Sequence, residues 1–281
     1  MTEPNLGLSI IIPASNEAAL IRACLRSLVD QHWTRTAPVE VVVVANGCSD
    51  DTAKRARAFT QAFSDRGWHL HVVERGQGGK IGALNAGDAV ARGGMRVYLD
   101  ADVVLAADLL DALADALAVP QARYASGRID ITAPSNLASR AYARMWRRVP
   151  FMAEGVPGCG LFAVNAAGRM RWGAFPDVAS DDTYVRLLFA PEERIAVSPA
   201  YLWPVVEGLS ALVRVRRRQD RGVAEIAERY PELVANEGKP HLPLGRKLAM
   251  ALRDPVGFAV YSGVALAARM GRDDGGWSRG R

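Results

Sequence analysis

The sequence has little cysteine, little lysine and no long apolar segment. Its three cysteines, Cys24, Cys48 and Cys159, are far apart and form no C-x-x-C pair, so neither a disulfide framework nor a zinc site is expected. The longest nearly apolar stretch, Pro255 to Ala268, is shorter than the roughly 20 residues that cross a bilayer. The N-terminus shows no basic segment followed by an apolar run, so no signal peptide is expected. A reducing cytoplasm is therefore the expected compartment.

Charge is distributed unevenly along the chain. Residues 1–120 carry 11 basic and 14 acidic side chains, a net of −3, whereas residues 121–281 carry 24 and 16, a net of +8. Only four of the 35 basic residues are lysine, and arginine suits bidentate contacts with phosphate or carboxylate better than lysine does. The arginine excess indicates either an anionic partner of the second half or a GC-rich coding sequence, and composition alone leaves both open. With 49% apolar residues the chain can bury a core, which excludes a disordered protein.

Strand-like and helical patterns alternate four times in the first half. The predicted strands cover residues 8–12, 39–44, 69–73 and 96–99, and the predicted helices cover residues 17–31, 80–91, 108–119 and a segment from about residue 52. This alternation predicts an α/β fold with a mostly parallel, Rossmann-like sheet that carries helices on both faces. Ligands of such sheets bind beyond the carboxyl ends of the strands, where most polar residues and glycines of this half are found.

The second half is less regular and predicts a helical extension at its end. The predicted strands cover residues 124–131 and 161–164, and the predicted helices cover residues 137–149, 181–189, 209–230 and 244–270. We divide the chain into residues 1–120, residues 121–235 of the same domain, and a C-terminal extension, 236–281, whose tail from Gly271 is expected to be mobile.

The pair Asp100 and Asp102 follows the fourth strand. Carboxylates two residues apart on a strand point to the same side, and two such oxygen ligands can hold Mg²⁺ or Mn²⁺ beside a phosphate. The alternative is an aspartate-rich turn that caps the next helix. The position of the pair, with polar and glycine loops at every neighbouring strand end, favours the metal site.

A glycine-rich loop, residues 76–79, opens the helix that begins at Lys80. Its backbone amides and the lysine could receive an anion. It is not a P-loop, because Glu74 and Ile81 stand where that motif requires glycine and a hydroxyl residue. The alternative is a flexible loop with a surface lysine.

Two further clusters carry charge in the second half. Asp181 and Asp182 begin a predicted helix, where they either favour the helix dipole or, with one pKa raised by the other carboxylate, supply a general base. Five arginines lie between Arg214 and Arg221, which indicates either a solvated helix face or contact with a diphosphate, a membrane surface or nucleic acid.

Four segments in order, Ile10–Glu17, Val41–Thr52, Gly79–Gly87 and Leu99–Asp102, resemble the donor half of the family 2 glycosyltransferases, which are inverting enzymes of the GT-A fold. The resemblance covers roughly residues 7–120 and continues more weakly to about residue 225. It implies that residues 1–120 bind a nucleoside-diphosphate sugar and that residues 121–235 hold the acceptor and the catalytic base.

The resemblance also implies a role for single residues. The donor nucleotide would lie against Pro13, Ala14, Asn16, Glu17, Asn46, Lys80 and Asp100, with Arg218 and Arg221 near its diphosphate. Asp102, with Asp100, would hold Mg²⁺ or Mn²⁺. The acceptor side would comprise Gly158, Cys159, Gly160 and Asp181, and Asp182 would be the general base.

Departures from the family pattern narrow the expected function. Gly222 stands where processive members carry tryptophan, and no transmembrane helix is expected, so we expect a non-processive enzyme acting on a glycan, lipid-linked or small-molecule hydroxyl. Asn46 replaces an aspartate that commonly contacts the base, which puts uridine recognition by that residue in doubt.

Apolar residues of the helix expected over 244–270 lie on one stripe. That helix either packs on the domain or contacts an anionic membrane from its inner face; the stripe comprises Leu248, Leu252, Val256, Val260 and Val264. The alternatives to glycosyl transfer are a sugar-phosphate nucleotidyltransferase and a basic protein that binds nucleic acid, although no nucleic-acid partner is expected.

Overall fold

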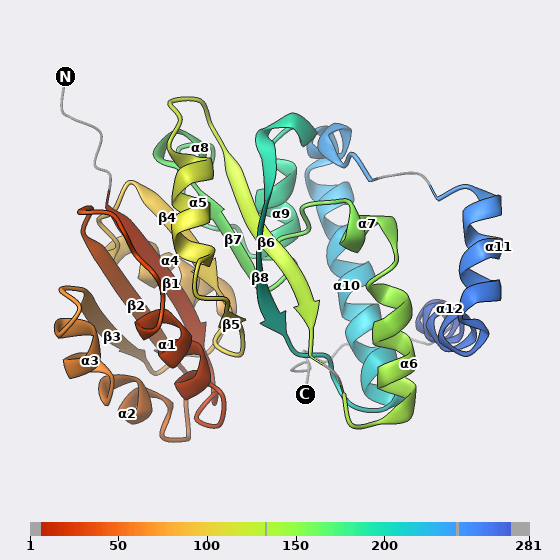
Figure 1. Ribbon diagram of the computed structural model, residues 1–281, viewed down its shortest axis with the longest axis horizontal. Helices are drawn as coiled ribbons and strands as arrows, with labels where there is room; N and C mark the ends of the chain where they lie inside the picture. The colour runs from red at the N-terminus through yellow and green to blue at the C-terminus, as the bar shows by residue number, and fades with distance from the viewer. Residues whose placement is uncertain (1–6, 133, 240–241, 271–281) are drawn as a thin grey trace.

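The computed structural model describes residues 7–132, 134–239 and 242–270 (Figure 1). Eight strands form one sheet in the order β3-β2-β1-β4-β7-β6-β8-β5. Their bounds are β1 Leu8–Ala14, β2 Val39–Asn46, β3 His69–Arg75, β4 Met95–Leu99, β5 Val104–Leu105, β6 Tyr124–Ile131, β7 Leu161–Val164 and β8 Arg194–Trp203. Strands β1 to β4 are parallel, and β7 joins them antiparallel to β4, so the sheet continues from the first half of the chain into the second.

Helices flank the sheet and extend beyond one end of it (Figure 1). The helices of the first half are α1 Ile21–Val29, α2 Thr52–Arg57, α3 Thr60–Ser64, α4 Lys80–Val90 and α5 Leu109–Leu117. Those of the second half are α6 Leu137–Trp146, α7 Pro150–Ala153, α8 Ala166–Arg169, α9 Asp181–Leu187, α10 Leu209–Arg229, α11 Leu244–Arg253 and α12 Pro255–Met270, with 3-10 turns at η1 Pro191–Glu193 and η2 Pro231–Asn236.

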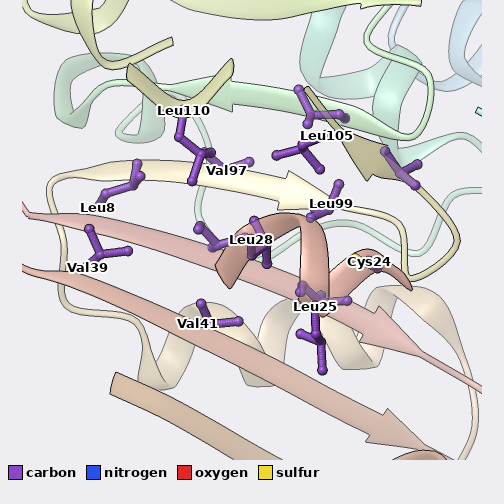
Figure 2. Packing of buried hydrophobic residues seen from close by; sticks show 14 of the residues in the cluster. Leu8, Cys24, Leu25, Leu28, Val39, Val41, Val97, Leu99, Leu105 and Leu110 are labelled. Atoms are coloured by element: carbon purple, nitrogen blue, oxygen red, sulfur yellow. The ribbon is translucent and has the colours of Figure 1, made fainter. Parts of the chain in front are cut away.

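The apolar runs of the central strands are continuous because both faces of the sheet are covered. In β1, Ile10 and Ile12 pack in the cluster that contains α1 and α5, whereas Ile11 packs in a cluster with Leu84 of α4 on the other face. Figure 2 shows α1 lying over the strands of the first cluster, with Leu25 among their side chains. Complete burial of these residues fixes the strand ends, and with them the loops that carry the polar side chains.

Strand β8 was not expected from the sequence. It contains Pro199, which has no backbone N–H to donate to a neighbouring strand, and its side chains are mostly half-buried without regular alternation. The sheet accommodates the proline through an irregularity, since Ser126 of β6 pairs with Ala196 and Arg128 with Ala200.

The helix expected over residues 244–270 is instead two helices, α11 and α12. The helix is interrupted at Asp254, and Pro255 begins α12. The Asp254 carboxylate accepts hydrogen bonds from Arg144 of α6 and from the backbone N–H of Gly257. The expected single apolar stripe is therefore wrong: Leu248 and Val256 are 60% and 62% exposed, whereas Val264 is 2% exposed. Nowhere in the described ranges is a helix long and apolar enough to span a membrane.

Candidate active site

A small cavity of about 10 Å³, room for about one water molecule, lies at the carboxyl edge of the parallel strands and brings residues from five segments together. It lies where β1 and β4 end, next to the first residues of α4 and α9 and the loop before β7. Its walls are Pro13, Lys80, Leu84, Tyr98, Leu99, Asp100, Gly158, Gly160, Phe162, Asp181 and Asp182. Seven of these residues were expected at the site from the sequence, namely Pro13, Lys80, Asp100, Gly158, Gly160, Asp181 and Asp182.

Lys80 links the donor half to the second half of the chain. Its Nζ atom lies 3.0 Å from Asp100 Oδ1 and 3.2 Å from Asp181 Oδ1. The Asp181 side chain is 8% exposed and that of Lys80 is 40% exposed. The lysine therefore balances two carboxylates that are far apart in the sequence and fixes the start of α9 against the end of β4.

The charges of this cluster alter one another's protonation. Burial raises the pKa of Asp181 to about 6; Lys80 opposes this shift, and the carboxylates of Asp182 and Asp100 add to it. Burial would lower the pKa of Lys80, but the three nearby carboxylates outweigh it and raise that pKa above its ordinary range. The expectation that one carboxylate of the Asp181–Asp182 pair has a raised pKa holds, although burial contributes more than the neighbouring charge.

The two adjacent aspartates occupy different environments. Asp181 forms the ion pair with Lys80, whereas Asp182 Oδ1 accepts hydrogen bonds from Ser180 Oγ at 2.8 Å and from the Thr183 backbone N–H at 2.7 Å. Both donors hold the same oxygen, which orients the carboxylate and leaves its other oxygen for a ligand. Asp182 is therefore the better placed of the two to exchange a proton with a molecule in the cavity.

Asp100 and Asp102 lie in a turn and not on a strand. Strand β4 ends at Leu99, and the Val103 N–H donates to the Asp100 carbonyl at 3.2 Å. The alternation of strand residues therefore does not direct the two carboxylates to one side, contrary to the expectation from the sequence. Both residues are half-buried. Within the described ranges, no group of three or more His, Cys, Asp and Glu side chains is arranged to hold a metal.

The expected nucleotide-binding loop after β1 is fastened to the loop after β2. Asn16 adopts a φ of 55°, and its side-chain oxygen accepts from the Ser49 backbone N–H at 2.7 Å. The Glu17 N–H donates to Thr52 Oγ1 at 2.8 Å. Ala14, the last residue of β1, is 1% exposed. These contacts give the loop a fixed shape at the edge where the cavity opens.

Asn46 is less accessible than expected for a residue that borders a nucleotide. It is 2% exposed, its Nδ2 donates to the Gly79 carbonyl at 3.0 Å, and its Oδ1 accepts from Arg75 at 3.2 Å. In this structure Asn46 holds the glycine-rich loop in place. The same loop packs against Gly47, where a Cβ would lie 2.8 Å from the Gly78 backbone.

The loop before β7 depends on glycine on both sides of Cys159. Gly158 and Gly160 have φ of 69° and 75°, and a Cβ on them would collide with Tyr124 and with Trp203 respectively. The Cys159 carbonyl accepts from Tyr201 Oη at 2.7 Å. Burial raises the pKa of the Cys159 thiol, with a further contribution from Asp182, so this cysteine is not an activated nucleophile.

The arginine run on α10 divides between two faces. Arg216 bonds to Asp220 and to Tyr261 of α12, and Arg217 donates to the last carbonyls of α12. Arg218 lies one turn before Gly222, whose missing Cβ would lie 2.8 Å from Ser180 Cβ, so helical spacing directs Arg218 to the face beside the Asp182 turn. Arg221 precedes Glu225 by one turn, and Glu225 accepts from the Ala179 N–H on the same side.

Sequence reasoning missed the aromatic and aliphatic wall of the cavity. Tyr98 stacks on Phe162 with ring centroids 4.8 Å apart, and Tyr98 Oη donates to Asp88 at 2.9 Å. Both rings belong to buried strands and pack in the same cluster as Leu84. Their apolar strand pattern predicted core residues, and only the placement of α4 and β7 shows that this core reaches the cavity.

Comparison with known sequences finds one family over more than half of the chain. The model of the family described as Glycosyl transferase family 2 matches residues 9–172. The glycosyltransferase AglE of Haloferax volcanii is 36% identical over 95 residues, which are 34% of this chain and 30% of that protein. The uncharacterized glycosyltransferase YibD of Escherichia coli is 30% identical over 95 residues, 34% of this chain and 26% of that protein. These matches span less than a third of either relative.

Solved structures match nearly the whole chain. The mannosyltransferase PcManGT of Pyrobaculum calidifontis, in complex with GDP-Man and Mn²⁺, aligns with a TM-score of 0.59 at 23% identity, over 96% of this chain and 78% of that one. Residues 1–349 of S. aureus TarS in complex with UDP align with a TM-score of 0.54 at 15% identity, over 95% and 92%. At these identities the likeness establishes the fold, which is of the GT-A type with added C-terminal helices.

Proposed function

The chain belongs to glycosyl transferase family 2, and on that premise we propose that it moves a sugar from a nucleoside-diphosphate sugar to an acceptor hydroxyl with inversion at the anomeric carbon. The observation that carries the proposal is the cluster of Lys80, Asp100 and Asp182 at the carboxyl edge of the sheet. Open α/β sheets bind their ligands at this edge. The nucleotide would lie along the loops that follow β1 and β2, and the reacting sugar near Asp182.

The residues present fit a divalent cation shared with a diphosphate. Asp100 and Asp102 offer carboxylate oxygens, and Mg²⁺ or Mn²⁺ in such sites takes one or two carboxylates together with substrate phosphates and water, so a larger protein cluster is not required. When bound, the cation would neutralise charge that develops on the departing diphosphate. Arg218 and Arg221, on the α10 face beside Ser180, would add positive charge from the protein.

Asp182 would act as the general base. Its Oδ1 is held by Ser180 and Thr183, and its second oxygen would take the proton of the acceptor hydroxyl. The acceptor oxygen then forms the new bond to the anomeric carbon as the bond to the diphosphate breaks, and the nucleoside diphosphate leaves. A single displacement of this kind inverts the anomeric configuration. Lys80 and Asp181 hold α9 so that Asp182 faces the cavity.

Gly222 supports a non-processive enzyme. Any side chain at this position would begin with a Cβ only 2.8 Å from Ser180 Cβ, so a tryptophan could not be accommodated without movement. The Ser180 turn carries Asp182, so a larger residue would displace the base and α10 relative to each other. The acceptor would then be a glycan, a lipid-linked molecule or a small molecule, with α11 near an anionic membrane in the lipid-linked case.

A donor-binding experiment tests the proposal. Calorimetric titration with a panel of UDP- and GDP-sugars, with and without Mn²⁺, should find at least one donor whose binding strengthens when the metal is present. Asp102→Asn should remove this metal dependence. The exposed Asp108, at the start of α5, provides the matched control, because Asp108→Asn should bind as the unaltered protein does. Binding that EDTA leaves unchanged contradicts the metal role, and the absence of binding to any nucleotide sugar contradicts the proposal.

A further inference from the structure

A second cavity lies among the C-terminal helices, away from the candidate active site. It measures about 390 Å³, within the range of roughly 300–1,000 Å³ typical of small-molecule sites. Its walls are mainly apolar and come from four helical segments, including Met145 of α6, Met250 of α11, and Phe258 and Leu266 of α12. The two cavities share no wall residue. The second cavity therefore has room for an apolar ligand that is not the donor nucleotide.

The charged groups of this cavity are all positive, and its other polar groups are the hydroxyls of Tyr261 and Ser262. Arg216, Lys247 and Arg269 line it, and none of its wall residues is acidic. Arg216 is held by Asp220 and Tyr261, which fixes its guanidinium at the wall. Among the described residues, neither Lys247 nor Arg269 has a carboxylate within ion-pair distance. Two cations beside an apolar cavity complement a ligand that joins a hydrocarbon chain to an anionic head.

Helix α11 forms one wall although it buries none of its own residues. It has 10 residues, and helices of that length are marginal in water without tertiary contacts. It forms an ion pair between Arg246 and Glu154, and it packs against α12. Figure 1 shows α11 at the end of the molecule farthest from β3. A hydrocarbon chain in the cavity would supply the apolar contact that α11 lacks.

We propose that the cavity between α6, α10, α11 and α12 binds one long-chain lipid with a phosphate head. The chain lies against Met145, Phe258 and Leu266, and the phosphate is held by Lys247 and Arg269. The proposal does not rest on the glycosyl-transfer reaction, because it concerns residues outside the donor cavity. It gives the basic second half of the chain one defined anionic ligand.

Dodecyl phosphate, used below its micelle concentration, is the probe. Isothermal titration calorimetry should show saturable binding of one molecule per chain, and amide hydrogen exchange of residues 244–253 should slow when the probe is bound. Ala265→Trp fills the cavity and should abolish binding, whereas Ala259→Trp, on an exposed position of the same helix, should leave it unchanged.

The charged head is tested separately, because the tryptophan variant could alter the packing of α12. The double variant Lys247→Gln, Arg269→Gln should weaken dodecyl phosphate binding by about tenfold or more, because it removes both positive charges that would hold the phosphate. Arg253→Gln is the matched control, because this arginine of α11 does not line the cavity. Dodecyl maltoside, which has a neutral head, should bind the unaltered protein no better than dodecyl phosphate binds the double variant.

Three results would overturn the proposal. One is the absence of dodecyl phosphate binding, and another is equal binding by the unaltered protein and the double variant. The third is binding to phosphatidylglycerol vesicles that Ala265→Trp does not affect, without binding of the monomeric probe, which would assign α11 to a bilayer surface and leave the cavity without a ligand. None of these outcomes depends on a donor sugar, so the failure of this proposal is distinguishable from failure of the proposed reaction.

Discussion

At the candidate active site a lysine is paired with carboxylates, whereas two cations of the described C-terminal helices are not. At the site, Lys80 lies between the carboxylates of Asp100 and Asp181, and its charge is balanced within the protein. In the C-terminal helices, no described carboxylate pairs with Lys247 or Arg269. The first arrangement fixes a geometry before a ligand arrives, whereas the second leaves positive charge available to an anionic ligand.

The same two regions differ in burial. Helix α1 buries Leu25 and Leu28 completely against the strands that position the site, while α11 buries nothing and exposes Leu248. A rigid sheet edge suits a reaction that needs groups held in place, and a lightly packed helix suits a surface that gains order from a ligand. The comparison predicts that substitutions in the two regions affect different measurements.

The largest effect is expected at the general base. Asp182→Asn should lower turnover by about 10²–10⁴-fold, the usual contribution of general base catalysis, while donor affinity stays within a few-fold. The amide oxygen can still accept from Ser180 and Thr183, so the fold of the turn should be retained. Asp177→Asn, at an exposed position just upstream, is the control and should keep full activity. Steady-state kinetics and donor titration check both variants, and unchanged turnover in Asp182→Asn removes the residue from this role.

A pair of leucine truncations tests the contrast in packing. Leu25→Ala should lower the free energy of unfolding by about 2–5 kcal/mol, because the side chain is fully buried in the main core. Leu248→Ala should change it by no more than about 0.5 kcal/mol, because that side chain is 60% exposed. Urea denaturation followed by circular dichroism measures both. Equal losses would show that α11 is packed as firmly as α1.

Removing the positive charge of Lys80 should lower the free energy of unfolding by an amount that depends on pH. Lys80→Met should lower the free energy of unfolding by about 1–3 kcal/mol near neutral pH, between the values for exposed and buried pairs. A carboxyl whose folded pKa is raised stabilises the fold at low pH and loses that contribution as pH rises through the folded pKa, which for Asp181 is about 6.

Without Lys80 the pKa of Asp181 should rise further. The free energy of unfolding of the variant should therefore continue to fall at pH values where that of the unaltered protein has stopped falling. The stability gap between the variant and the unaltered protein should therefore widen between about pH 6 and about pH 8. Lys54→Met, at an exposed lysine of α2, should show no such gap. Chemical denaturation at several pH values measures it, and a gap that is constant over this range contradicts the coupling.

Two glycines on helices should respond to alanine in opposite directions. Gly222→Ala should destabilise by about 1–3 kcal/mol and lower turnover, because its Cβ would lie 2.8 Å from Ser180 Cβ beside the base. Gly263→Ala, in the middle of α12 where nothing lies within 4 Å of the added carbon, should stabilise by up to about 1 kcal/mol. Thermal unfolding and kinetics distinguish the two, and a stabilised Gly222→Ala would show that α10 does not pack tightly on the Asp182 turn.

The sequence predicted the sheet well where its strands are apolar runs covered on both faces. The expected strand 8–12 lies within β1, and the expected strand 161–164 coincides with β7. Strand β8 was missed because Pro199 interrupts its pattern and its pairing needs an irregularity in the register. The break at Asp254 had a visible signal, an aspartate followed by proline, which is typical of a helix start.

Seven of the residues that line the cavity were predictable from the sequence, but the contacts between them were not. The motifs brought Lys80, Asp100 and Asp182 to one edge of the sheet, where the structure also places them. The ion pair between Lys80 and Asp181 joins segments whose approach depends on how the whole sheet and α9 pack, and no local pattern encodes it. The burial of Asn46 could not be predicted either, because an asparagine at a strand end has the same sequence context whether its amide faces a ligand or a loop.

Identifying the products of the reaction tests inverting glycosyl transfer most directly. The purified chain is incubated with the donor that binds best and with Mn²⁺, and the released nucleotide is identified by mass spectrometry while NMR reports the anomeric configuration of the sugar product. We expect release of a nucleoside diphosphate and a product of inverted configuration. Retained configuration, or release of inorganic diphosphate from a nucleoside triphosphate and a sugar phosphate in place of glycosyl transfer, would contradict it.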